Sequence, residues 1–218
     1  MSLSIHNIYR QIFKIWRRRR FAVFLRLATP RPSDLILDVG GTPWFWSSSS
    51  ASVKQIDVLN IAAQDVGEIG GARFLLRSLV GDGCRLEMGD KSYDIAFSNS
   101  VIEHVGSWER QQQFAKEIRR VGKAVWVQTP AHECPIEPHY LTPLVHYLPV
   151  PVRRAIARWF TVWGLLEKPT PEQVKEMVET TRLLRKREMR ELFPDCQILT
   201  ERLLWIIPKS YIAFRPRG

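Results

Sequence analysis

The chain has 218 residues, a formal net charge of +10 and 45% hydrophobic residues. This is a globular composition, and it excludes a wholly disordered chain and a collagen-like or low-complexity fibre. Cys84, Cys134 and Cys196 lie far apart and form no Cys-x-x-Cys pair. A disulfide scaffold or zinc ribbon is therefore not expected, and a reducing compartment is favoured.

The sequence contains no run of the ~18–20 uncharged apolar residues that a membrane-spanning helix needs. The N-terminal arginines lie after and among the apolar residues, whereas a signal peptide carries its basic residues first. We therefore expect a cytoplasmic protein, with peripheral contact at the inner membrane surface left open.

The positive charge is concentrated at the N-terminus, because residues 1–30 contain no acidic residue. Apolar residues at helical spacing predict a helix over 5–27, interrupted by the arginine run 17–20. That run is compatible with a solvated helix face, contact with an anionic membrane, a lid over a ligand pocket, or contact with phosphate groups of a substrate. The stretch 28–34 ends the helix with two prolines.

Short apolar runs alternate with turns in the central part of the chain. Such runs are typical of buried parallel strands, and one amphipathic helix is predicted over 107–122, between Ser107 and Gly122. The predicted strands are 35–39, 54–60, 76–82, 93–98 and 123–130. This alternation favours a parallel sheet with helices on both faces.

The C-terminal part is less regular. Residues 131–168 are rich in proline and aromatic residues, with a helix predicted over 152–164, and a long charged helix is predicted over 171–193. The segments 197–206 and 209–214 predict a C-terminal hairpin. The predicted fold is therefore an α/β, Rossmann-like, doubly wound sheet of seven mostly parallel strands with an antiparallel C-terminal strand. The expected organisation is a basic helical arm (1–30) and one domain (31–218), with a substrate-side insertion at 131–168.

A candidate nucleoside site lies at the ends of the first two predicted strands. In a doubly wound sheet, ligands bind at the carboxyl ends of the strands. Asp38 is followed there by Gly40 and Gly41, which let a ligand approach the backbone, and Asp57 lies in the next strand. Such an acid can accept hydrogen bonds from ribose hydroxyls.

A third acid, Asp82, follows the third predicted strand between Gly81 and Gly83. Its carboxylate can accept a hydrogen bond from an adenine amino group. The Gly-x-Gly-x-x-Gly turn of nicotinamide-binding proteins is absent. We expect the carboxylates of Asp38, Asp57 and Asp82 to converge on one adenosyl-shaped crevice.

These residues resemble the motifs of class I S-adenosylmethionine-dependent methyltransferases of the type 11 kind. DVGG (38–41) is similar to the first motif of that family, and GDG (81–83) with YDIAFSNSVIEHV (93–105) is similar to its later signature. The resemblance is strong over 33–130 and implies a seven-stranded sheet with a reversed final strand. It implies S-adenosylmethionine as the cofactor.

The resemblance also implies roles for individual residues. Asp38, Gly40 and Gly41 would line the methionine end of the cofactor, and Asp57 would bind the ribose. Asp82 would meet the adenine, with Gly81 and Gly83 letting the ring approach, and Ser98 and Asn99 would border the sulfonium and the substrate. The family's later loop glycines are replaced by Thr42 and Trp44, which leaves Trp44, Phe45 or Trp46 to cover the cofactor.

The expected reaction is methyl transfer to oxygen of a small-molecule or lipid-linked acceptor. Proximity supplies most of the catalysis, and a general base assists a hydroxyl acceptor. His139 is the preferred base and His104 the second candidate. No metal is expected, because Ser100 replaces the glutamate that accompanies the Glu103-His104 pair in the metal-binding relatives of this family.

Nucleic acid is not an expected partner, because the sequence after the fourth predicted strand, SNSV, lacks the Pro-Pro-aromatic motif of many base methylators. Two other function classes remain open from the sequence. One is a non-catalytic binding module of the same fold, suggested by the altered glycine loop. The other is an NAD(P)-dependent oxidoreductase.

Overall fold

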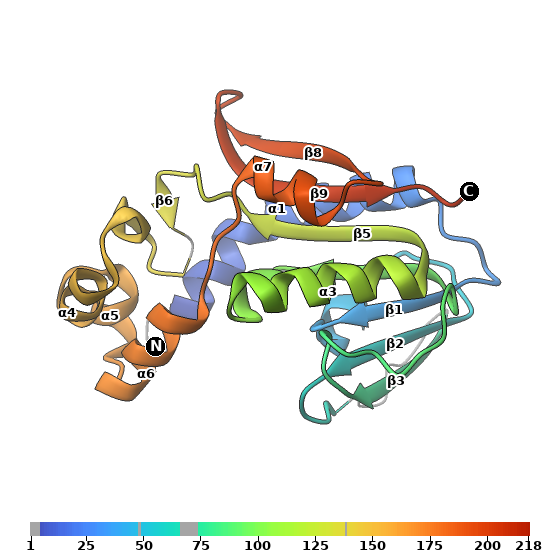
Figure 1. Cartoon of the computed structure of the whole chain (residues 1–218), viewed down its shortest axis with the longest axis horizontal. Coiled ribbons are helices and arrows are strands. Elements are labelled where there is room, and N and C mark those ends of the chain that lie inside the picture. Colours follow the sequence, from blue (N-terminus) through green and yellow to red (C-terminus); the bar gives the residue numbers. More distant parts are fainter. Residues whose placement is uncertain (1–4, 48, 66–73, 138) are drawn as a thin grey trace.

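The computed structural model describes residues 5–47, 49–65, 74–137 and 139–218. Its centre is a seven-stranded sheet with the strand order β3-β2-β1-β4-β5-β9-β8 (Figure 1). The strands are β1 (Leu35–Val39), β2 (Gln55–Asn60), β3 (Leu75–Val80), β4 (Tyr93–Asn99), β5 (Gly122–Pro130), β8 (Gln197–Leu203) and β9 (Ile207–Arg215). Neighbouring strands from β3 to β5 are parallel, and β9 runs antiparallel to both β5 and β8. The predicted sheet and its C-terminal hairpin are confirmed.

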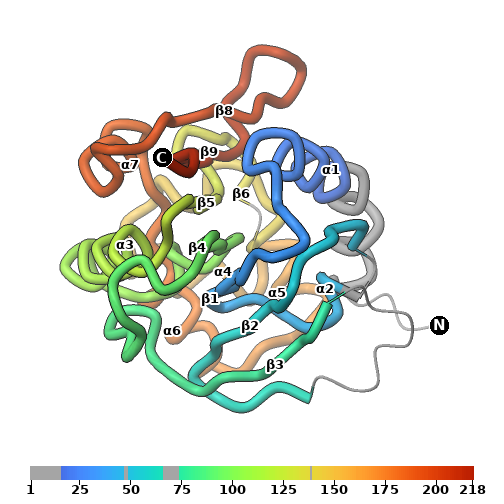
Figure 2. Tube along the Cα trace, turned by 90° about the vertical axis from the view of Figure 1, so that its right-hand side faces the viewer, coloured from blue at the N-terminus to red at the C-terminus, as the bar shows by residue number. Residues whose placement is uncertain are grey.

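Helices cover both faces of the sheet because alternate side chains of each buried strand point to opposite sides. On one face, Ile36 and Trp126 pack with Phe24 of α1 (Ile5–Ala28). On the other, Leu37 and Val125 pack with Phe114 of α3 (Trp108–Val121). Figure 2 shows α3 and α7 (Lys186–Leu192) on one side of the sheet, and α1 and α2 (Pro43–Ser47) on the other.

Helix α3 begins and ends where the sequence predicts. The Ser107 hydroxyl caps its first turn by accepting a hydrogen bond from the backbone N–H of Arg110, and Gly122 follows its last residue. Its apolar residues form one buried face against the sheet, which includes Phe114 and Ile118. The helix therefore fixes the segment between β4 and β5, where the predicted site residue His104 lies.

The segment after β5 forms a group of short elements beyond the carboxyl ends of the parallel strands (Figure 1). They are the short elements β6 (Ile136–Glu137), β7 (Thr142–Pro143) and η2 (Val145–Tyr147), and the helices α4 (Val150–Phe160), α5 (Val162–Glu167) and α6 (Pro171–Thr180). Another short helix, η1 (Ile102–His104), follows β4. The single helix predicted over 152–164 is wrong. The helix breaks at Thr161, whose hydroxyl donates to the Ala157 carbonyl and accepts from the backbone of Gly164, so that α5 folds back against α4.

The long helix predicted over 171–193 is also wrong. It divides into α6 and α7, and residues 181–185 between them are extended. The backbone N–H of Arg182 donates to the Glu103 carbonyl, and the Leu184 carbonyl accepts from the His132 N–H. These bonds to distant segments, together with burial of the Leu184 side chain, replace the helical bonds that the local sequence favours.

The N-terminal helix is confirmed as α1. Within the part of the chain that the structure describes, no helix combines the length and the apolar character needed to cross a bilayer. The arginine run does not face one environment, because Arg18 and Arg19 are exposed whereas Arg20 is buried. Arg20 forms an ion pair with Glu201 of β8, which ties α1 to the edge of the sheet.

Candidate functional site

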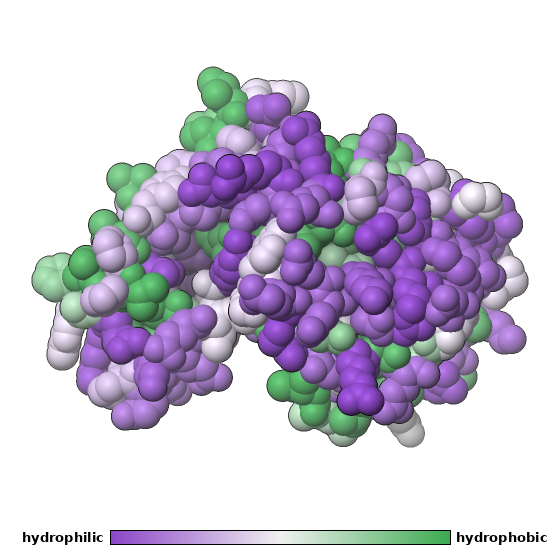
Figure 3. Space-filling model, in the orientation of Figure 1, coloured by the Kyte–Doolittle hydropathy of each residue, from purple (hydrophilic) through white to green (hydrophobic). Residues whose placement is uncertain are grey.

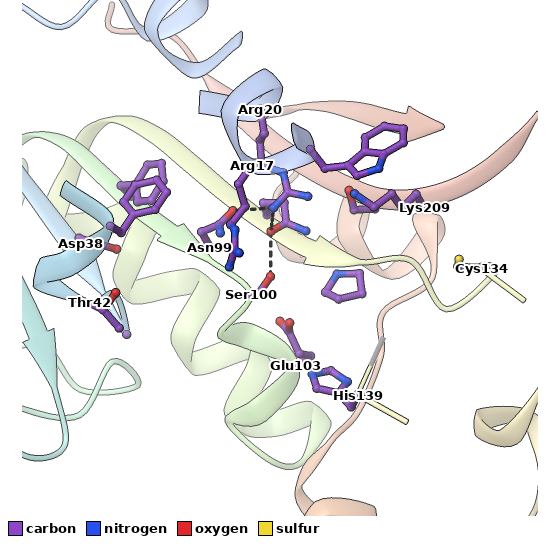
Figure 4. Close-up of a pocket in the computed structure, with 18 of the residues that line it drawn as sticks. Arg17, Arg20, Asp38, Thr42, Asn99, Ser100, Glu103, Cys134, His139 and Lys209 are labelled. Carbon is purple, nitrogen blue, oxygen red and sulfur yellow. Dashed lines mark hydrogen bonds between the residues drawn. The ribbon is translucent and has the colours of Figure 1, made fainter. Parts of the chain in front are cut away.

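A cavity of about 580 Å³ lies at the carboxyl ends of β1, β4 and β5. Residues from α1, the loop after β1, the segment after β5 and the β8–β9 hairpin line it. In Figure 4, Asp38 and Thr42 lie at one end of the cavity, Glu103 and His139 lie at the other, and Asn99 and Ser100 lie between them. The cavity therefore joins two separate groups of polar side chains.

The turn after β1 requires its two glycines. Gly40 has a φ of +76°, and a Cβ there would come within 2.5 Å of Val101. A Cβ on Gly41 would lie 1.8 Å from Oδ2 of Asp38, so the carboxylate occupies the space that a side chain would take. The turn thus places backbone and the Asp38 carboxylate together at the cavity wall.

Asp38 has the features expected of a group that holds a cation. Its side chain is buried, and Oδ2 accepts a 2.7 Å hydrogen bond from the indole N–H of Trp46. Oδ1 is also buried and has no hydrogen-bond partner among the described residues. Burial raises the pKa of Asp38 to about 7, although the Trp46 bond acts in the opposite direction. A bound ammonium group would satisfy Oδ1 and stabilise the ionised form.

The aromatic residues after the glycine turn have different roles. Trp46 is fully buried in the core with Phe24 and Phe97, so it orients Asp38 and does not cover a ligand. Trp44, with 60% of its surface exposed, and Phe45 line the cavity. Of the three aromatic residues expected to cover a cofactor, Trp44 and Phe45 are therefore placed to do so.

The structure places Asp57 away from this cavity. It lies within β2, opposite Leu37 of β1, three residues before the strand ends. Its buried carboxylate accepts hydrogen bonds from the guanidinium of Arg77, from the Tyr93 hydroxyl and from the Gln55 amide. The expectation that Asp57 joins Asp38 and Asp82 in one crevice is corrected, because this carboxylate is enclosed in the sheet.

Asn60 occupies the position that the sequence interpretation gave to Asp57. It is the last residue of β2, and its amide donates a 2.9 Å hydrogen bond to the Gly41 carbonyl. The predicted end of this strand at residue 60 was a signal that could have identified it. The sequence interpretation selected the acid Asp57 instead of Asn60, although Asn60 lies at the end of the strand.

The loop that contains Asp82 and its flanking glycines lies against β1 and β2, and Gly81, Asp82 and Gly83 do not line the cavity. A Cβ on Gly83 would lie 2.7 Å from Val39 of β1, and one on Gly81 would lie 3.2 Å from Leu59 of β2. Both glycines therefore let the loop pack against the strand ends. The half-exposed Asp82 carboxylate accepts from the Cys84 backbone N–H and pairs with Arg110, and these bonds lower its pKa.

Ser98 and Asn99, at the end of β4, point to different places. The Ser98 hydroxyl is buried and donates to the Val39 carbonyl, so it joins β4 to β1 and does not line the cavity. Asn99 lines the cavity and accepts a hydrogen bond from Arg20, which also donates to Gln128 of β5. The buried Arg20 is thus a cavity residue that links α1 to both strands.

The two candidate bases are brought together. Nε2 of His139 lies 3.0 Å from Nε2 of His104, and Nδ1 of His139 lies 2.5 Å from Oε1 of Glu137. Burial alone would lower the pKa of His139, but the Glu137 carboxylate raises it above its usual range. Burial lowers the pKa of His104 to about 4, which keeps that ring neutral. Glu137, His139 and His104 are hereafter the histidine cluster.

Glu103 lies beside the histidine cluster and lines the cavity. It is buried, its Oε2 accepts from the Thr129 hydroxyl, and within the described part of the chain its Oε1 has no hydrogen-bond partner. Burial raises its pKa to about 7. Ligand atoms of Glu103, His104 and His139 lie within 4.8 Å of one another, a spacing that a divalent cation can use. The histidine cluster can therefore act as a proton acceptor, and its two histidines together with Glu103 can form a cation site.

Residues 39–124 match the model of a methyltransferase domain. No sequence among the curated proteins matches the chain. Three solved structures illustrate the likeness of the fold.

A Rhodobacter sphaeroides protein described as a Zn-dependent alcohol dehydrogenase has a TM-score of 0.59 at 14% identity, with 92% of this chain and 89% of that chain covered. Magnesium protoporphyrin IX methyltransferase from Synechocystis, with bound S-adenosylhomocysteine, has a TM-score of 0.52 at 14% identity (91% and 81% covered). The N-methyltransferase NodS of Bradyrhizobium japonicum has a TM-score of 0.51 at 10% identity (92% and 96% covered).

At these identities the solved structures show the fold alone. The match to a methyltransferase domain spans residues 39–124, which begin one residue after Asp38 and include the glycine turn. The chain thus contains a segment that matches a methyltransferase domain, within a fold that it shares with methyltransferases of known structure.

Proposed function

We propose that the protein transfers the methyl group of S-adenosylmethionine to a hydroxyl oxygen of a small-molecule or lipid-linked acceptor. The observation that carries this proposal is that one cavity extends from the Asp38 carboxylate to the histidine cluster. One end suits the cofactor, and the other supplies a group that can take a proton from an acceptor hydroxyl.

On the cofactor side, Oδ1 of Asp38 receives the ammonium of the methionine moiety. Asn60, at the end of β2, takes the ribose hydroxyls, and Asp82 takes the adenine amino group. Three observations support this assignment: the unpartnered Oδ1 atom, the position of Asn60 beside Gly41, and the packing of the Gly81–Gly83 loop against the ends of β1 and β2.

Bound S-adenosylmethionine supplies an electrophilic methyl group, so that a carbon–oxygen bond forms as the carbon–sulfur bond breaks and the electron pair stays on sulfur. His139 accepts the hydroxyl proton at Nε2, where the acceptor hydroxyl replaces the contact with His104, while Nδ1–H remains bonded to Glu137. The Glu137 carboxylate stabilises the imidazolium that forms. His104 stays neutral and adds no competing positive charge.

The lining of the cavity favours an acceptor with an apolar part. It includes large apolar side chains from α1, α2 and the segment after β5, namely Trp16, Trp44, Phe45, Ile136 and Leu141. Since such surface binds apolar ligands while a few polar groups fix their orientation, we assign residues 131–168 to the acceptor side.

Incorporation of isotopic methyl from S-adenosylmethionine into extracts of small molecules and lipids tests the proposal. The wild-type protein should produce a labelled product whose methyl group is bound to oxygen. The variant H139Q should bind S-adenosylhomocysteine as the wild type does and transfer at least ~10²-fold more slowly. Full transfer by H139Q would remove the base assignment, and labelling on nitrogen or carbon would remove the proposed O-methylation.

We also propose that α1 contacts an anionic membrane surface at the cavity. Arg18 and Arg19 are exposed there, and Trp205, at the tip of the neighbouring β8–β9 hairpin, has 92% of its surface exposed. In Figure 3, apolar residues gather at this tip and over α4 and α5. Each basic side chain near such a surface contributes about 1 kcal/mol of binding free energy.

Co-sedimentation with vesicles distinguishes this contact from simple solvation. The wild-type protein should bind vesicles that contain phosphatidylglycerol more tightly than phosphatidylcholine vesicles, and R18Q/R19Q should lose the preference. Leu75, exposed on the edge strand β3, provides the matched control L75S for the apolar variant W205S. Equal binding by L75S and W205S, or no binding by the wild-type protein, would contradict the proposal.

A further inference from the structure

A second cavity, of about 420 Å³, lies between the segment after β5 and the connection from α6 to α7. Its lining comes from the loop before β6, from β6 and the turn after it, from η2 and α4, and from the chain between α6 and α7 with the first turn of α7. Figure 1 shows these elements at the carboxyl end of the sheet, on the side where α4, α5 and α6 gather. We call this space the arginine cavity, after Arg153, Arg182, Arg185 and Arg187, which line it.

The walls of the arginine cavity contain buried polar atoms that have no hydrogen-bond partner in the part of the chain that the structure describes. The Tyr140 hydroxyl is one, in a residue that is 1% exposed. Nδ1 of His146 and Nε of Arg153 are two more. Buried polar groups are normally hydrogen-bonded, and three unpaired atoms around one space indicate a missing ligand. Two of these atoms, on Tyr140 and Arg153, carry a proton that can be donated.

The charge in the arginine cavity is unbalanced. Its two carboxylates are already engaged, because Glu137 bonds to His139 and to the Tyr140 N–H, and Glu188 bonds to Arg182. Among the described residues, no carboxylate forms an ion pair with the other three lining arginines, Arg153, Arg185 and Arg187. The arginine cavity therefore offers an anionic ligand both positive charge and hydrogen-bond donors.

We propose that the arginine cavity is a binding site for a phosphate group. Guanidinium groups match the geometry of phosphate oxygens and form charge-assisted hydrogen bonds to them. Arg153 and Tyr140 would hold the oxygens in the buried part, while the exposed Arg185 and Arg187 would neutralise the remaining charge. The volume exceeds that of one phosphate, which leaves room for a group attached to it.

The position of the arginine cavity links it to the histidine cluster. Glu137 lines the arginine cavity, whereas its partner His139 lines the first cavity, so this pair separates the two spaces. Thr181 also lines the arginine cavity and lies 3.5 Å from Nδ1 of His104. If the phosphate group is part of the methyl acceptor, its binding would position the acceptor beside His139. This link to the acceptor rests on the proposed function.

Binding is tested with the intact protein in a chloride buffer, by calorimetric titration with inorganic phosphate and separately with glycerol 3-phosphate. The variants R153Q and Y140F remove the buried donors, and R185Q/R187Q removes exposed charge without touching the core. The control is R190Q, because Arg190 is an exposed arginine on the same helix α7 that does not line the cavity. Thermal unfolding and binding of S-adenosylhomocysteine show whether each variant is folded.

The wild-type protein should bind phosphate, and R153Q and R185Q/R187Q should each weaken binding about tenfold, as expected for loss of a charge-assisted hydrogen bond. Y140F should weaken it less, and R190Q should leave it unchanged. Absence of binding, or equal weakening by R190Q, would overturn the inference.

The two titrants distinguish the sources of the phosphate group. Tighter binding of glycerol 3-phosphate assigns the site to a phosphorylated organic molecule, and tighter binding of inorganic phosphate assigns it to the free ion. Phosphate binding without any methyl transfer would contradict the proposed function and leave this site intact.

Discussion

Replacement of Asp38 by asparagine distinguishes two effects of its carboxylate, which are the destabilisation of the folded protein and the binding of the cofactor. Folding raises the pKa of this buried carboxyl from 3.8 to about 7. At about 1.4 kcal/mol per pKa unit, the charged carboxylate destabilises the folded protein by about 4 kcal/mol above pH 7. That cost grows as pH rises from about 4 to about 7 and is absent below this range.

D38N keeps an oxygen for the Trp46 indole and removes the charge. We expect D38N to unfold at a higher temperature than the wild type at pH 8, with a difference that shrinks toward pH 4. Binding should change in the opposite direction, because the charge-assisted bond to the cofactor's ammonium is lost. That loss is about 1.5–3 kcal/mol, or about 10- to 150-fold in Kd for S-adenosylhomocysteine.

Thermal unfolding between pH 4 and pH 8 and calorimetry with S-adenosylhomocysteine measure both effects. In the wild type, binding requires the ionised carboxylate, so Kd should rise about tenfold from pH 8 to pH 6, with about one proton released on binding at pH 6. D38N should show neither effect. A stability difference that does not depend on pH, or unchanged affinity in D38N, would refute the reasoning.

Three further changes test other parts of the site. N60A should weaken binding of S-adenosylhomocysteine about tenfold through loss of the ribose contact; unchanged calorimetric affinity would remove Asn60 from the site. D57N should lower the free energy of unfolding in urea by about 1–3 kcal/mol, because it disrupts a buried hydrogen-bonded network, and should leave that affinity unchanged; weaker binding by a folded D57N would restore the ribose role. EDTA should leave methyl transfer unchanged, whereas a loss restored by a divalent cation would make Glu103, His104 and His139 its ligands.

The parts of the fold that depend on local sequence could be predicted. The strands were found because apolar runs end at glycine or proline, and α3 because Ser107 and Gly122 bound an amphipathic segment. The helix predicted over 171–193 failed because the bonds that divide it come from Glu103 and His132, which are distant in sequence. Propensity alone contains no information about such bonds.

The site was predicted in part for the same reason. The glycine turn and the Asp38 carboxylate are contiguous in sequence and lie together at the cavity. Asp57 was misplaced because its chemical type was given more weight than its depth in the strand. His104 and His139 were each identified as candidates, but their contact across 35 positions could be seen only once the segment after β5 had folded over η1.

A crystal structure of the protein with S-adenosylhomocysteine tests the central claim most directly. The account predicts the amino group of the ligand at Oδ1 of Asp38, the ribose hydroxyls at Asn60 and the sulfur facing the end of the cavity that holds His139. A ligand bound elsewhere, or an Asp38 carboxylate that makes no contact with it, would contradict the account.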